Sequence, residues 1–189
     1  MYRLAPHAST PPVTVTGVSL MWMEFGGGRH QLTYRISDAA RLVVPGRTSR
    51  EREDGLWRAT CFELFLSSRI GPDYHEFNFS PSQRWAAWRF AEYREGRTDW
   101  PMDRPPLIDS GFEGEDFVLR VQLSGFPEGM AVAGVSAVVV ERSLPEPGDD
   151  SDDPAWIGVG SLWALNHPRP LPDFHHRGSF TMPLAPGFR

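Results

Sequence analysis

Short runs in which apolar and polar residues alternate recur along this chain, and they predict β-strands. The clearest are 31–36, 62–66 and 117–123, where every second residue is apolar. The run AVAGVSAVVV at 131–140 is continuously apolar and predicts a strand buried on both faces. Eighteen glycines and 18 prolines are spread through the chain, as is typical of many short strands joined by turns. The pattern predicts an all-β fold, namely a two-sheet antiparallel β-sandwich of about ten strands.

Turn residues such as Gly26–Gly28 and Pro45–Gly46 separate the expected strands. The strands are expected at 13–25 (with a break near Gly17), 31–36, 41–44, 59–67, 74–79, 85–93, 117–123, 130–141 and 156–165. The segment 85–93 could also be a helix, but a returning hairpin strand is favoured after so short a turn. Residues 1–12 are rich in proline and are expected to be loose, whereas 13–189 should form a single domain.

The stretch 56–92 contains the densest mixture of polar and aromatic residues. Alternation places Phe62, Leu64 and Leu66 on one face of a strand and leaves Glu63 on the other. Glu76 and Asn78 alternate in the same way on the next strand, so all three polar residues could share a face. Either Trp88 or Trp85 would return on the third strand, together with Arg89. Carboxylates and amides bind hydroxyl groups and tryptophan offers a flat apolar surface, so these residues indicate a sugar site. The alternative is a solvated face on which the glutamates pair with arginines.

Other kinds of site stay open. Glu63 and Glu76 could be the acid and base of a glycosidase if they flank a glycosidic bond at the required separation. The acidic run at 149–153 could bind calcium, although it lacks the glycine and the final glutamate of an EF-hand loop. Four histidines could serve a metal or, with a methionine, a haem, although no HxxxH or HExxH spacing is present. They are His75, His167, His175 and His176.

Composition excludes several classes of function. All 19 basic residues are arginine, which excludes Schiff-base lysines and P-loop lysines. The single cysteine, Cys61, excludes an intrachain disulfide. A net charge of −5 argues against nucleic acid as a partner. Because no run is long and apolar enough for a membrane span or a signal peptide, we expect a cytoplasmic protein. No nucleophile–base pair is visible, so we do not expect an enzyme.

Three blocks of sequence resemble a known family. They are LWRATCFELFL at 56–66, YHEFNFSPSQRWAAWRF at 74–90 and SLWALNHPRPLPDFHHRGSF at 161–180. Together they are similar to DOMON-like domains related to family 9 carbohydrate-binding modules. The resemblance implies a β-sandwich with a ligand cleft on one sheet, and ligands that are either sugars or haem. It also implies an aromatic sugar-binding role for Trp57, Trp88 and Trp163, sometimes with a structural calcium nearby.

These observations predict a non-catalytic protein that binds a sugar or sugar derivative through tryptophan stacking and hydrogen bonds. The alternatives are a haem- or metal-binding protein and a structural or interaction module. No cofactor is expected, and the expected partner is a small molecule or glycan. The predicted ligand-binding residues are Trp57, Glu63, Glu76, Asn78, Trp88, Arg89, Trp163, His167 and His175.

Overall fold

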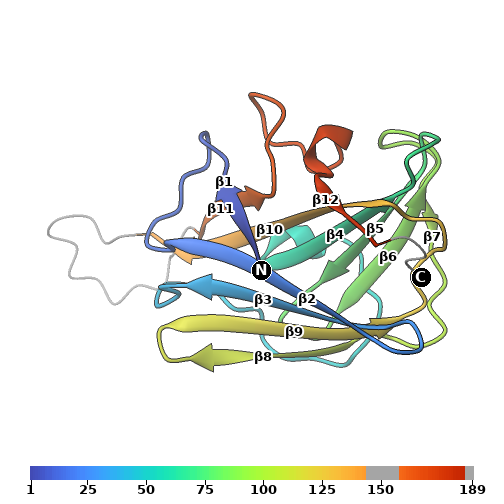
Figure 1. Cartoon of the computed structure of the whole chain (residues 1–189). Helices are drawn as coiled ribbons and strands as arrows, with labels where there is room; N and C mark the ends of the chain where they lie inside the picture. The colour runs from blue at the N-terminus through green and yellow to red at the C-terminus, as the bar shows by residue number, and fades with distance from the viewer. Residues whose placement is uncertain (144–157, 186–189) are drawn as a thin grey trace, which may run out of the picture.

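In the computed structural model, residues 1–143 and 158–185 are described, and they form strands with two short 3-10 turns (Figure 1). The turns are η1 (Leu56–Arg58) and η2 (Arg177–Ser179). Neither turn, nor any other helical segment in the described ranges, has the length and hydrophobicity that crossing a membrane would require. The strands are β1 (Tyr2–Pro6), β2 (Gly17–Phe25), β3 (Arg29–Ser37), β4 (Cys61–Ser67), β5 (Tyr74–Phe79), β6 (Trp85–Phe90), β7 (Thr98–Asp99), β8 (Leu107–Glu113), β9 (Asp116–Ser124), β10 (Val132–Arg142), β11 (Gly158–Ala164) and β12 (Met182–Pro183).

All of these strands belong to one antiparallel sheet, which curls so that its two halves face each other (Figure 1). The order is β7-β6-β5-β4-β10-β11-β1-β2-β3-β9-β8, with β12 paired to β10. The predicted fold of two separate sheets is therefore wrong. The cause is β1, which pairs through Leu4 with β2 and through Pro6 with β11 and so joins the two halves. The all-β class and the antiparallel pairing agree with the sequence analysis.

Elements missed by the sequence patterns lie at the ends of the chain and at the edges of the sheet. The segment 1–12, expected to be loose, contains β1. The expected strand 41–44 is reduced to an isolated bridge between Leu42 and Glu141. Strand β8 was not predicted, because only Ile108 of its residues is buried and no apolar alternation results.

The main hydrophobic core lies between the two halves of the curled sheet. Phe62, Leu64 and Leu66 of β4 are completely buried there, as the alternation predicted. Across the core, Phe62 meets Tyr34 of β3 with ring centroids 4.9 Å apart. This packing fixes which face of β4 and β5 points inward, and therefore which face is left for a site.

A second apolar cluster lies on the outer face of β4, β5 and β6, under the C-terminal segment. Its buried members are Leu56, Cys61, Phe65, Tyr74, Ala86, Trp88, Phe90 and Phe180. Phe180 stacks on Phe65 with centroids 5.5 Å apart, and Tyr74 stacks on Phe90 at 4.8 Å. The C-terminal segment is thus held on the sheet by aromatic packing.

The ring of Phe180 packs directly over Gly134 of β10. A Cβ atom at Gly134 would collide with the Phe180 ring. We expect Gly134→Ala to lower the free energy of unfolding by about 1–3 kcal/mol, since overpacking in a filled site costs this much. Denaturant unfolding measures the change. Gly160→Ala on β11, where a Cβ meets nothing within 4 Å, is the control and should be near neutral. Equal effects of the two substitutions would contradict this account.

Candidate functional site

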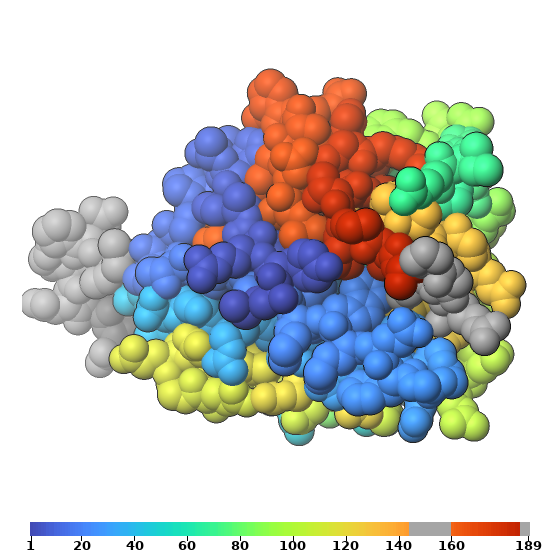
Figure 2. All heavy atoms as spheres, viewed as in Figure 1, coloured from blue at the N-terminus to red at the C-terminus, as the bar shows by residue number. Residues whose placement is uncertain are grey.

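A cavity of about 700 Å³ opens on the outer face of the sheet, beneath the C-terminal segment. Its size falls in the range of small-molecule sites in proteins. In the space-filling view the C-terminal residues gather on the upper side of the molecule, beside green residues from the middle of the chain (Figure 2). The lining residues are Trp57, Glu63, Glu76, Trp88, Phe90, Arg94, Arg97, Val138, Leu162, Pro172, Phe174 and His175.

Two buried glutamates from neighbouring strands, Glu63 of β4 and Glu76 of β5, line this cavity. Glu63 pairs with Asn78 in the β4–β5 register and Glu76 with Phe65, so the two glutamates are diagonal neighbours on one face. They are only 4% and 5% exposed. The Ser136 hydroxyl donates a hydrogen bond to Glu63 Oε2 at 3.0 Å, and Asn78 Nδ2 donates to Glu76 Oε1 at 3.0 Å. Each carboxyl therefore keeps one oxygen for which no hydrogen-bond donor is assigned among the described residues.

Burial changes the protonation of these carboxyls. It raises the pKa of Glu63 to about 7, with the Ser136 hydrogen bond acting in the opposite direction. It raises the pKa of Glu76 to about 8, and the charge of Glu63 adds to that rise. Two carboxyls this close titrate as a pair, so near neutral pH the pair retains protons instead of carrying two full charges.

His175 forms one wall of the cavity beside Glu76. Its Nδ1 and the Tyr74 hydroxyl are 2.7 Å apart and share a hydrogen bond, and its Nε2 lies 3.7 Å from Glu76 Oε2. Burial lowers the pKa of His175 to about 4, and the charge of Arg94 lowers it further. The imidazole is therefore neutral at physiological pH and supplies no positive charge to the glutamate.

The two tryptophans of the cavity differ in accessibility. Trp57, on η1, is 53% exposed, although the guanidinium of Arg58 lies 5.4 Å from its ring centroid. Trp88 is only 2% exposed, and the guanidiniums of Arg52 and Arg97 lie 5.2 and 5.4 Å from its centroid. Trp57 therefore offers the more accessible ring, while Trp88 acts as a covered wall.

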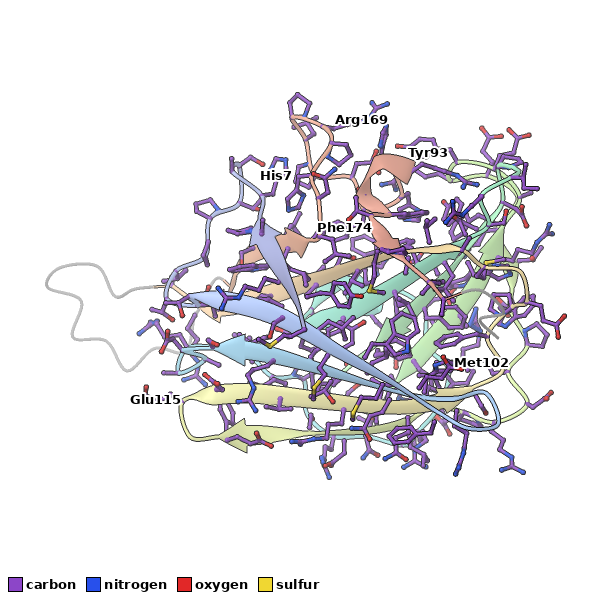
Figure 3. All side chains as sticks on the ribbon, viewed as in Figure 1. His7, Tyr93, Met102, Glu115, Arg169 and Phe174 are labelled. Carbon is purple, nitrogen blue, oxygen red and sulfur yellow. The ribbon has the colours of Figure 1, made fainter. Side chains whose placement is uncertain are left out.

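The C-terminal segment closes the cavity from above. Asp173 anchors it by accepting hydrogen bonds from the Tyr93 hydroxyl at 2.6 Å and from Arg94 Nη2 at 3.0 Å. Tyr93 and Phe174 both lie on this upper side, near η2 (Figure 3). Arg177 adds a hydrogen bond to Ser67 Oγ at 3.1 Å. These bonds hold the C-terminal segment onto the loop that follows β6 and onto the end of β4.

Five predicted site residues line the cavity, and a sixth supports it. Those lining it are Trp57, Glu63, Glu76, Trp88 and His175. Asn78 is completely buried and orients Glu76 through the hydrogen bond described above.

The other three predicted site residues lie outside the cavity lining. Arg89 points to the opposite face from Trp88 and pairs with Asp73 at 3.3 Å. Trp163 is buried in the main core, where its Nε1 donates to Ser161 Oγ at 2.9 Å. His167 Nε2 hydrogen-bonds the Ala5 carbonyl at 2.9 Å and holds the C-terminal segment to β1.

Sequence reasoning missed the other lining residues, which are Phe90, Arg94, Arg97, Val138, Leu162, Pro172 and Phe174. Phe90 has a signal, because it lies two residues after Trp88 on the same face of β6. The arginines lie in a loop of no periodicity, and Phe174 lies in a segment far along the chain. Their contribution depends on tertiary packing that no local pattern encodes.

No model of a known family matches this chain, and no curated protein matches it. A solved structure does match: a protein of Bacteroides uniformis described as a proposed carbohydrate-binding protein. The two share a fold. The TM-score is 0.50 and the sequences are 18% identical over 94% of this chain and 83% of that one. At this identity the likeness establishes the fold alone.

Within residues 1–143 and 158–185, no group of three or more His, Cys, Asp or Glu side chains is placed to hold a metal ion. The cavity lining contains His175 but no methionine, and Met102 packs against the main core instead (Figure 3). The acidic run at 149–153 lies outside the described residues.

Proposed function

We propose that this protein binds a sugar or sugar derivative without chemical conversion, in the cavity over β4, β5 and β6. The observation that carries the proposal is the meeting of Trp57, Glu63 and Glu76 in one cavity of about 700 Å³. The apolar face of a sugar ring can stack on an indole, while its hydroxyls bond to carboxyl oxygens. The fold shared with a proposed carbohydrate-binding protein is compatible with this role.

Carboxyl oxygens at the cavity support a ligand rich in hydroxyl groups. Glu63 and Glu76 line the cavity, and their hydrogen bonds with Ser136 and Asn78 use only Oε2 of Glu63 and Oε1 of Glu76. A buried polar atom without a partner costs free energy, and a bound hydroxyl group or water would recover it.

Trp57→Ala tests the stacking. We expect it to weaken sugar binding about tenfold, since an aromatic stacking contact contributes roughly 1–1.5 kcal/mol. Titration calorimetry against mono- and disaccharides measures the affinity. Phe112→Ala is the control, because Phe112 is similarly exposed, at 55%, but lies on edge strand β8 and does not line the cavity. The proposal fails if no sugar binds the parent protein, or if the two variants lose affinity equally.

A further inference from the structure

The two glutamates lining the cavity lack a cationic partner of their own. Across the described ranges, no arginine lies within ion-pairing distance of Glu63 or Glu76, and the only neighbour of that kind is the neutral His175 at 3.7 Å. A buried carboxyl pair without a counter-charge is costly unless something supplies that charge. The cavity gives a ligand access to both carboxyls.

The arginines that reach the cavity are already paired with acidic groups. Arg94 Nη2 lies 3.0 Å from Asp173 Oδ1, and Arg97 Nη2 lies 3.4 Å from Asp54 Oδ2. Arg97 also covers the Trp88 ring. Their charges are thus partly offset at the rim, and they act on the glutamates only at a distance. The charge of Arg94 lowers the pKa of both glutamates and that of Arg97 lowers the pKa of Glu76, but burial outweighs both effects.

Apart from Arg94 and Arg97, the titratable groups beside the glutamates are uncharged. Burial raises the pKa of the Tyr74 phenol to about 12 and also raises the pKa of the Cys61 thiol. On β10, the residue facing Glu63 is Ser136, which carries no charge. The aromatic walls Phe90 and Phe174 further favour a cation, because their rings attract positive charge.

We propose that the ligand is an amino sugar whose ammonium group binds between Glu63 and Glu76. This inference rests on the sugar-binding function proposed above and narrows its ligand class. The ammonium donates hydrogen bonds to the free carboxyl oxygens, and the pair gives up protons to solvent as the cation enters. The sugar ring then extends toward Trp57 at the open side of the cavity.

Calorimetry on matched sugar series tests the inference. Each series contains the 2-amino sugar, its N-acetyl form and the 2-hydroxy sugar, in the gluco, galacto and manno configurations. We expect the preferred amino sugar to bind at least tenfold more tightly than its two counterparts at pH 7. Its binding heat should depend on the ionisation heat of the buffer, because protons are released, whereas the neutral sugars should show no such dependence.

A Glu63→Gln/Glu76→Gln double variant should lose the amino-sugar preference and the proton release, while it still binds neutral sugars weakly. Its thermal unfolding transition shows whether it is folded. Glu24→Gln, an exposed site on β2, should behave like the parent protein. Equal affinity for amino and neutral sugars, or a preference retained in the double variant, would overturn the inference and leave sugar binding intact. Failure of all nine sugars to bind would overturn both.

Discussion

Replacement of Glu141 by alanine should lower the free energy of unfolding by about 3–4 kcal/mol, one of the largest effects of any single substitution in this protein. Glu141 is completely buried at the end of β10. Its carboxylate accepts hydrogen bonds from the backbone N–H groups of Val13, Thr14 and Val15 at 2.8, 2.7 and 3.0 Å, and from the Thr14 hydroxyl at 2.8 Å. Alanine leaves these donors without an acceptor, and each buried donor without a partner costs about 1 kcal/mol or more.

Denaturant and thermal unfolding measure this effect. Glu115→Ala is the matched control, since Glu115 is exposed in the turn between β8 and β9 (Figure 3) and should change stability by less than about 0.5 kcal/mol. Glu141→Gln should fall between the two, because an amide keeps an accepting oxygen but turns a donor toward the backbone N–H groups. A loss in Glu141→Ala no larger than the control would contradict the anchoring role of this carboxylate.

The unliganded protein should lose stability as the pH rises from about 6.5 to 8.5. The pKa values of Glu63 and Glu76 are raised by burial to about 7 and 8, so the folded state holds protons that the unfolded state has released. The stability that the two protonated carboxyls contribute is complete below the pKa of an unfolded glutamate. It is lost as the pH rises through the pKa values of the folded state. Glu76→Gln removes one of these groups and should stabilise the protein at pH 8.5 by about 1–3 kcal/mol.

Thermal unfolding at several pH values checks this prediction. The range above pH 6.5 isolates the glutamates, because His75 and His175 act with the opposite sign below it. Burial lowers the pKa of each histidine to about 4, so their contribution is present above the unfolded histidine pKa and is lost as pH falls. A free energy of unfolding that stays constant between pH 6.5 and 8.5 would contradict the raised pKa values of the buried carboxyls. An equal pH dependence in the parent protein and in Glu76→Gln would contradict them as well.

The candidate site could be predicted from sequence where period-two alternation controls it. Alternation in 61–67 and 74–79 separated Phe62 and Phe77 from Glu63 and Glu76, and the structure places these pairs on opposite faces. The register that makes the two glutamates neighbours follows from the short connection between β4 and β5. Local pattern and tertiary structure agree here because one face must be buried.

Local patterns failed where function depends on distant segments. The alternation in 158–164 cannot reveal that Trp163 faces the main core, since β11 is apolar on both faces. Three cavity residues, Phe174 of the C-terminal segment and Arg94 and Arg97 of the loop after β6, come from irregular segments. The joining of the two expected sheets into one could not be predicted either. Strand β1 ends in Pro6 and has only one buried residue, Leu4, so it shows no apolar alternation.

The position of β1 has a consequence for how the protein folds. Ala5 pairs with Ala164, so the strand at the start of the described chain finds its partner near the other end. Contacts of such long sequence separation give a high contact order, and proteins dominated by them fold slowly. Within each half the hairpins are joined by a long-range pairing, β4 with β10 and β3 with β9, and the halves become one sheet only when β1 enters between β2 and β11. Since Asp173 and Phe174 lie beyond β11, we expect the binding cavity to be completed late in folding, together with this closure.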